Sequence, residues 1–89
     1  MTQNERRELV KRYNRAYDDS LYDVYTKPSH NKINAYEKIY HEMISCGGYG
    51  LKILSYNTFM FTCAYIKQGG DGSLYLIYHT PTRRDVIPM

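Results

Sequence analysis

A length of 89 residues excludes a multidomain protein, and a content of 43% hydrophobic and 15% aromatic residues excludes a disordered chain. The net charge of +3 permits a nucleic-acid or acidic-protein partner without requiring either. No apolar run approaches the roughly 20 residues that span a membrane. The start, MTQNERREL, lacks the apolar stretch of a secretion signal. We therefore expect a single domain over residues 1–89, a cytoplasmic location and no membrane contact.

The two cysteines, Cys46 and Cys63, fit reduced, buried thiols better than a disulfide scaffold, which needs more cysteines in so short a chain. A domain of this size buries only roughly 60–65% of its unfolded surface, so its stability should be modest. Oligomerisation would compensate for a small core, and a homodimer stays open.

The first predicted helix starts with a capping box, because Thr2 is followed three residues later by Glu5. Leu9, Tyr13 and Tyr17 then recur at helical spacing. The pattern predicts a helix that begins at residue 3 and extends to residue 19, or as far as residue 25.

This helix carries a concentration of positive charge. Its first fifteen residues hold two acids, Glu5 and Glu8, against five basic residues: Arg6, Arg7, Lys11, Arg12 and Arg15. Two interpretations stay open, a solvated helix face or a surface that contacts phosphates or an acidic protein.

A second helix is predicted over residues 31–45. Pro28 disfavours helix at the residue before it, and Gly47 and Gly48 supply a helical stop. Between them, apolar residues recur at a period near 3.6: Ile33, Tyr36, Ile39, Tyr40, Met43 and Ile44. Since the connection is short, the two helices should form an antiparallel hairpin or an L.

Period-two alternation of apolar residues predicts three strands over residues 51–56, 59–67 and 73–79. Gly69 to Gly72 forms the second turn, and Asn57 marks a turn or bulge before it, unless residues 51–66 are one bent strand. Pro81 and Pro88 resist regular structure, so residues 81–89 are expected as a tail, from which Val86 and Ile87 could dock on the sheet.

The predicted fold is α+β in the order ααβββ, a two-helix hairpin packed on a three-stranded antiparallel sheet. The core should be built from the apolar residues of both helices and all three strands: Leu9, Tyr13, Ile33, Tyr36, Ile39, Tyr40, Met43, Ile53, Phe61, Leu74 and Leu76.

No catalytic or metal-binding motif stands out. The histidines His30, His41 and His79 lack partners at zinc-ligand spacing. If the second and third strands pair, Cys63 could meet His79, but a thiol in an apolar strand should be inert. We expect no catalytic residue, no metal, no cofactor and no enzymatic activity.

Two further features suggest binding. Eleven tyrosines serve either as amphipathic core residues or as contact and base-stacking residues. Arg83 and Arg84 form a basic pair beside the hydroxyls of Thr80 and Thr82, either a surface tail or a site for a phosphate or carboxylate.

Residues 51–87 resemble a group of short bacteriophage and mobile-element proteins. The resemblance rests on a strand leading into SYNT, residues 55–58, which includes Tyr56, and on a hairpin followed by TPTRRDVI, residues 80–87. The family pattern has adjacent threonines and a histidine after arginine, where this chain has Pro81 and Asp85. The resemblance implies no established activity, but it implies a small accessory protein acting inside a bacterial cell.

Two functions follow as hypotheses. By analogy with small phage proteins such as anti-CRISPR proteins, the first is a protein that binds and inhibits a host protein, such as a defence nuclease. The second is a nucleic-acid-binding module. Sequestration of a nucleotide signal is a third option, which no residue singles out. The candidate contact residues are the five basic residues of the first helix, with Tyr56, Arg83 and Arg84.

Overall fold

The computed structural model describes residues 2–16, 30–56 and 61–89, apart from the side chains of residues 30–33 and 56. Within these ranges the chain forms two helices and four strands. In chain order they are α1 (Gln3–Arg15), α3 (His30–Ser45), β1 (Tyr49–Tyr56), β2 (Phe61–Gln68), β3 (Leu74–His79) and β4 (Arg84–Pro88). The α+β class is as predicted, and the fourth strand is an addition.

Helix α1 begins with the predicted cap. The Thr2 hydroxyl oxygen accepts a hydrogen bond from the backbone N–H of Glu5 at 3.2 Å. The helix ends at Arg15, because Ala16 has an extended backbone and donates its N–H to the Tyr13 carbonyl. The predicted continuation past Arg15 is wrong at Ala16, and residues 17–25 lie outside the described ranges. No glycine or proline follows Arg15 directly, so periodicity alone could not place this end.

Helix α3 matches the predicted range to within one residue at its start, and its stop has the predicted chemistry. Gly47 has a φ of +74°, which favours glycine. Gly48 donates its N–H to the Met43 carbonyl at 2.8 Å, and Gly47 donates to Ile44 at 3.2 Å. These two bonds are the Schellman motif that ends many helices.

The sheet has the order β1-β2-β3-β4, and each neighbouring pair is antiparallel. Ile53 lies opposite Cys63, so β1 and β2 are two paired strands and not one bent strand. The turn predicted at Asn57 lies outside the described residues. The turn between β2 and β3 is as expected, with Gly72 at a φ of +88° and an Asp71 carboxylate oxygen accepting from Ser73 N at 3.0 Å.

Strand β4 corrects the prediction of a C-terminal tail. It pairs with β3, so that Ile87 lies opposite Leu76 and Pro88 opposite Tyr75. Ile87 is 1% exposed. Proline is tolerated here because β4 is an edge strand, where a missing N–H costs no hydrogen bond on the open side.

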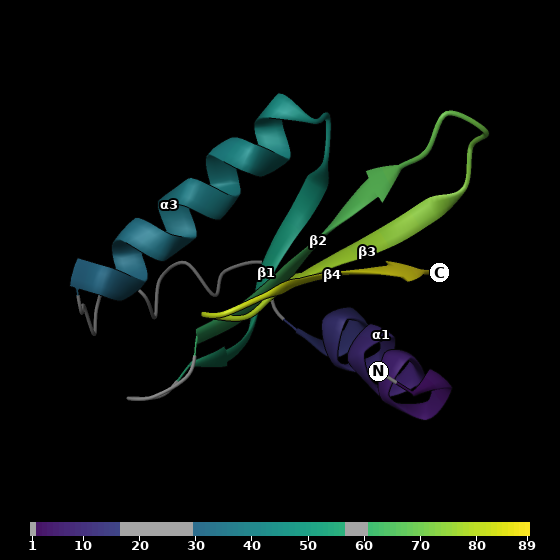
Figure 1. Ribbon diagram of the computed structural model, residues 1–89, viewed down its shortest axis with the longest axis horizontal. Coiled ribbons are helices and arrows are strands. Elements are labelled where there is room, and N and C mark those ends of the chain that lie inside the picture. The colour runs from purple at the N-terminus through teal and green to yellow at the C-terminus, as the bar shows by residue number, and fades with distance from the viewer. Residues whose placement is uncertain (1, 17–29, 57–60) are drawn as a thin grey trace.

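The two helices cover opposite faces of the sheet (Figure 1), so the predicted helical hairpin is wrong. Residues of α3 share one core cluster with Tyr65 and Ile77, and residues of α1 share the other with Ala64 and Leu76. These strand residues are sequence neighbours, and successive side chains of a strand point to opposite faces. Both faces of β2 and β3 are apolar, which is why each needs its own helix.

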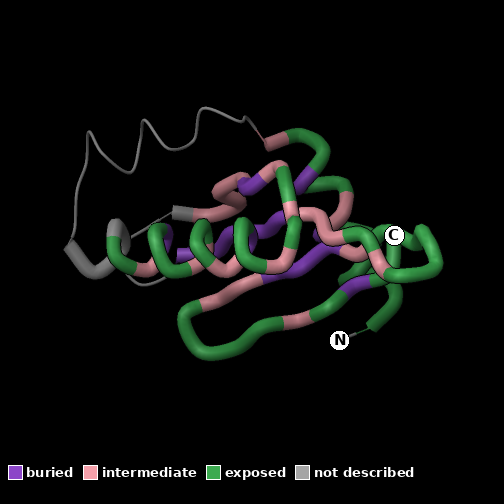
Figure 2. Tube along the Cα trace, turned by 90° about the horizontal axis from the view of Figure 1, so that it is seen from above, coloured by how far each residue is buried: buried purple, intermediate pink, exposed green. Residues whose placement is uncertain are grey.

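Burial is concentrated in the strands between the two helices (Figure 2). Six predicted core residues are buried: Leu9, Tyr13, Tyr36, Met43, Phe61 and Leu76. Ile39 and Ile53 are half-buried against the α3-side cluster. The side chain of Ile33 lies outside the description.

Two core predictions are wrong. Tyr40 is 44% exposed, because α3 turns the flank that carries Glu42 towards the sheet instead. Leu74 is 39% exposed, because it is the first residue of β3 after the turn. Residues outside the predicted core list also fill the centre of the sheet, namely Cys63, Ala64, Tyr65, Ile77 and Ile87.

Candidate functional site

Helix α1 is fixed to β1 by polar contacts. The Tyr13 hydroxyl donates to the Gly50 carbonyl at 2.5 Å, and Arg12 donates to the Leu54 carbonyl at 3.2 Å. The Lys52 ammonium lies 4.6 Å from the centre of the Tyr13 ring, a cation–π contact. These contacts set the rotation of α1 and therefore decide which of its side chains face solvent.

The five predicted basic residues of α1 are all exposed, but they do not share one face. Leu9 and Tyr13 are buried and define the sheet-facing side. Helical geometry places three cations, one turn apart, on the opposite side: Arg7, Lys11 and Arg15. Arg6 and Arg12 flank the sheet-facing side, one on each edge. We call Arg7, Lys11 and Arg15 the basic stripe.

Positive charge is concentrated on α1. The helix carries five basic and two acidic residues, so it alone accounts for the formal net charge of +3 of the whole chain. The ion pair of Lys11 with Glu8 spans 3.6 Å between side chains that are 67% and 63% exposed. A pair so exposed contributes little to stability. Arg6 and Arg7 lie near the helix N-terminus, where the helix dipole does not stabilise a cation.

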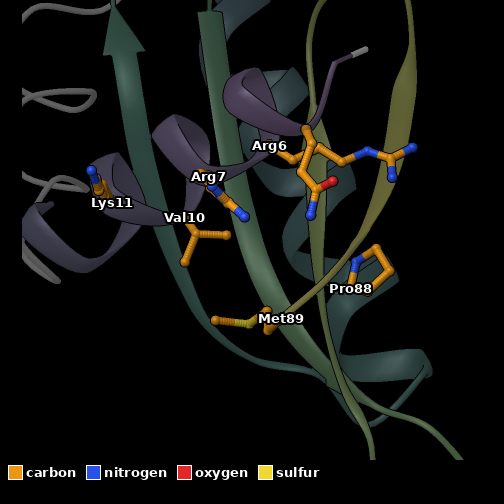
Figure 3. A pocket seen from close by; sticks show the side chains of 7 residues that line it. Arg6, Arg7, Val10, Lys11, Pro88 and Met89 are labelled. Atoms are coloured by element: carbon orange, nitrogen blue, oxygen red, sulfur yellow. The ribbon is translucent and has the colours of Figure 1, made fainter.

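A groove of about 560 Å³ lies between α1 and the end of β4. Figure 3 shows it from close by, with the α1 side chains on one wall and Pro88 and Met89 on the other. Its lining residues are Gln3, Arg6, Arg7, Val10, Lys11, Pro88 and Met89. Met89 is 48% exposed and donates its backbone N–H to the Leu74 carbonyl at 3.1 Å. The groove thus joins cationic and apolar surface, and we call it the α1–β4 groove.

On the other edge of α1, Arg12 and Arg83 come together in a second cavity of about 370 Å³. Glu5 and Glu8 line the same cavity, together with Asn4, Leu9 and Tyr78. Two guanidinium groups therefore share this cavity with two carboxylates. Its charge is compensated, which makes it a poorer anion site than the α1–β4 groove.

The structure separates the predicted pair of Arg83 and Arg84. Arg83 Nε lies 3.0 Å from Asp85 Oδ2, and Arg83 borders the cavity under α1. Arg84 Nε lies 3.6 Å from Glu42 Oε2 on α3. Strand alternation sends the two side chains to opposite faces, and each meets its own carboxylate. Tyr56 ends β1 opposite Phe61, and its side chain lies outside the description.

A polar cluster that the sequence analysis missed lies on the α3 face of the sheet. Three side chains from three strands converge on one oxygen, Glu42 Oε2. The Tyr65 hydroxyl donates to it at 2.5 Å, His79 Nε2 lies at 2.8 Å, and Arg84 Nε lies at 3.6 Å. The Cys46 thiol lies 3.8 Å from the Tyr65 hydroxyl. The strand positions of Tyr65 and His79 were visible in the sequence, but strand β4, which carries Arg84, and the orientation of α3 were not.

Electrostatics keep Glu42 ionised near neutral pH. Burial raises the pKa of Glu42, but hydrogen bonds from Tyr65 and His79 and the charge of Arg84 outweigh it and hold the pKa below its ordinary value of 4.5. Burial, and then the bond to Glu42, raise the pKa of Tyr65. Glu42 is therefore an ionised acceptor whose Oε2 is already occupied by donors, an arrangement that ties α3 to the sheet.

The Cys63–His79 contact was expected if β2 and β3 pair, and the two residues are indeed opposite each other. Cys63 is 0% exposed, and burial, together with the negative charge of Glu42, raises the pKa of its thiol to about 12. A thiol with so high a pKa is not a nucleophile near neutral pH. Among the described residues, no three His, Cys, Asp or Glu side chains gather as a metal site requires.

Apolar side chains are exposed along one flank of α3 and just beyond it. Tyr40 is 44% exposed, Ile44 one turn later is 58% exposed, and Tyr49 at the start of β1 is 50% exposed. We call these residues the α3 patch. It carries no charge of its own, in contrast to the basic stripe, and it is the second surface where a partner could bind.

No family model matches this chain, and no curated protein or solved structure is detectably similar to it. Neither helix in the described part of the chain is long and apolar enough to cross a membrane.

Proposed function

We propose that the chain is a non-enzymatic binding protein that covers an acidic surface of a host protein and thereby inhibits it. The observation that carries the proposal is the basic stripe. Arg7, Lys11 and Arg15 are exposed, lie one turn apart and belong to the helix that holds the entire net charge. The adjoining α1–β4 groove adds the apolar contact that a protein interface needs at its centre.

The sign of the charge restricts how inhibition could work. A protein that plugs a nucleic-acid channel must imitate a polyanion, and α1 is positively charged. The positive charge of α1 is better suited to binding an acidic surface of the target than to plugging a nucleic-acid channel. In a nuclease, the carboxylates that hold catalytic metal ions form such a surface. The choice of a host-defence nuclease as the target rests on the analogy with small phage proteins such as anti-CRISPR proteins.

Nucleic acid is the second candidate ligand, because the basic stripe could also contact phosphates. Three phosphate contacts would give a log–log salt slope of about −2.7, or a loss of about 40-fold in affinity between 50 and 200 mM salt. Single-stranded ligands also need stacking surfaces. Among the described residues that line the α1–β4 groove, none is aromatic. This composition favours a protein partner.

The test is capture of partners from a bacterial lysate, with and without nuclease and at low and high salt. The wild type is compared with a variant that carries Arg7→Glu and Lys11→Glu. A matched control carries Lys38→Glu and Lys67→Glu, the same number of charge reversals on α3 and β2. The proposal expects one stoichiometric protein after nuclease treatment, lost only in the α1 variant. Recovery of nucleic acid that disappears at high salt would support the second candidate instead.

Inhibition is tested by expressing the chain in a bacterium whose defence nuclease restricts a phage, and counting plaques. We expect the wild type and the Lys38/Lys67 control to restore plating, and the Arg7/Lys11 variant to fail. Restoration by all three proteins would show that the basic stripe is not the inhibitory surface.

A further inference from the structure

The α1–β4 groove narrows the chemistry of the partner. We infer that it binds a short extended segment of the partner with the pattern acid–apolar–acid. The carboxylates of this segment face the cations of α1, and its apolar side chain packs against Pro88 and Met89. This inference rests on the proposed function, since it assumes that α1 is the binding face, and it adds the ligand class.

Charge selects an acidic segment. The cations Arg6, Arg7 and Lys11 line the groove, and no acidic residue does. The cavity on the other edge of α1 is lined by Arg12 and Arg83 but also by Glu5 and Glu8. The two cavities differ in this respect: carboxylates line the second cavity and none lines the α1–β4 groove, although Lys11 also pairs with Glu8, which lies outside the groove lining.

The apolar residues of the groove lining favour an apolar side chain in the partner segment. Val10 is half-buried and packs against the core cluster under α1, so it forms a fixed part of the groove. Pro88 and Met89 are exposed on the opposite wall, as Figure 3 shows. Methionine adapts its shape to different apolar partners. A free phosphate or a nucleic-acid backbone would leave this surface unused.

The dimensions fit a strand-like segment. Arg7 and Lys11 are separated by four residues, or about 6 Å along the helix axis. In an extended peptide, residues i and i+2 lie on the same side at about 6.7 Å, so two acids can face two cations while residue i+1 faces the other wall. A volume of about 560 Å³ accommodates a few side chains, within the range of roughly 300–1,000 Å³ that is typical of ligand clefts.

The experiment is an NMR titration of the full chain with synthetic peptides, observing the methyl groups of Val10, Met89 and Ile44. The test peptide contains Glu-Leu-Glu between neutral residues. One control peptide replaces leucine by serine, and a second replaces both glutamates by glutamine. We expect shifts at Val10 and Met89 with the test peptide, and at least fivefold weaker binding of either control peptide. Equal binding of the serine control, shifts at Ile44 alone, or no shifts at Val10 and Met89 would each overturn the inference.

Two variants separate this inference from the proposed function. Met89→Ser removes the apolar side chain but keeps the backbone hydrogen bond to the Leu74 carbonyl. Because one apolar contact is lost, the variant should bind the test peptide about five- to tenfold more weakly. Arg7→Glu with Lys11→Glu should abolish peptide binding and partner capture alike. If the charge variant loses the partner but Met89→Ser binds peptide and partner normally, the groove inference fails and the proposed function stands. If the charge variant retains the partner, the proposed function fails as well.

Discussion

The hydroxyl of Tyr65, at the centre of β2, donates a hydrogen bond of 2.5 Å to the carboxylate of Glu42 on α3. The Tyr65 residue is 0% exposed, while the Glu42 side chain is 38% exposed. The bond therefore reaches from the core to the rim of the helix. It makes the position of α3 depend on a specific polar contact in addition to apolar packing.

Replacing Tyr65 by phenylalanine should lower the free energy of unfolding by about 1–2 kcal/mol. The ring volume stays, but a hydrogen bond to a charged acceptor is lost. Because Glu42 is partly exposed, the loss in the free energy of unfolding is limited. Urea unfolding at pH 7 measures the change through the midpoint, at constant m value. Tyr40→Phe on the exposed flank of α3 is the control, expected within about 0.5 kcal/mol of wild type. Equal losses in both variants would contradict the role of the Tyr65 hydroxyl.

Acid should weaken the protein through Glu42. Its pKa in the folded chain lies below the ordinary value of 4.5, because Tyr65, His79 and Arg84 together outweigh the effect of burial. A depressed carboxyl pKa stabilises the fold at pH values above the unfolded pKa, and this contribution disappears as the pH falls through the folded pKa. Urea midpoints between pH 7 and pH 3 should therefore fall more steeply for wild type than for Glu42→Gln. Parallel pH profiles would show that Glu42 gains nothing from its partners.

Gly50→Ala should destabilise the fold by about 1–3 kcal/mol, for two reasons. Gly50 has a φ of +71°, and a Cβ atom there would collide with the Tyr13 hydroxyl, which bonds the Gly50 carbonyl. Gly70→Ala is the matched control, since Gly70 has open space around it and lacks a positive φ. Thermal unfolding of both variants measures the difference. A loss as large in Gly70→Ala would point to a general sensitivity of glycines and not to the α1–β1 contact.

Alkylation should distinguish the two cysteines. Cys63 is fully buried and burial raises its thiol pKa to about 12, whereas Cys46 is half-buried at the end of α3. With iodoacetamide at pH 7.5, native protein should therefore be modified at Cys46 first, and at Cys63 only on unfolding. Mass spectrometry of the digested protein follows both sites. Modification of Cys63 in native protein at the rate of Cys46 would mean that β2 is more accessible than the structure implies.

Local chemistry explains which parts of the fold were predictable. Thr2 and Glu5 identify the start of α1, and Gly47 and Gly48 identify the end of α3, because caps depend on neighbouring residues only. The turn at Gly72 was predictable for the same reason, because its geometry also depends on neighbouring residues. Strand β4 was hidden because Pro88 is compatible with a strand only at an edge, and the edges of a sheet are not visible in the sequence.

Long-range geometry explains what was missed. An apolar stripe shows that a helix packs on a sheet, but not on which face, so the opposite placement of α1 and α3 needed the structure. The stripe of α3 was wide enough to include Tyr40, but the helix turns the Glu42 flank towards the sheet instead. The separation of Arg83 from Arg84 follows directly from strand alternation once β4 is recognised. Of the predicted contact residues, Arg6, Arg7 and Lys11 do line one groove.

The two walls of the α1–β4 groove belong to different elements, and this has a consequence for dynamics. Helix α1 is a short element on the outside of the sheet, the kind of segment that opens locally at a lower free energy than the whole domain. A ligand that needs both walls binds only while α1 is docked, so it must shift that opening equilibrium towards the closed form. Amide hydrogen exchange in α1 would then slow on binding, while exchange in β2 would follow global unfolding. Ligand binding in the groove would thus be detectable as slower exchange of the backbone amides of α1.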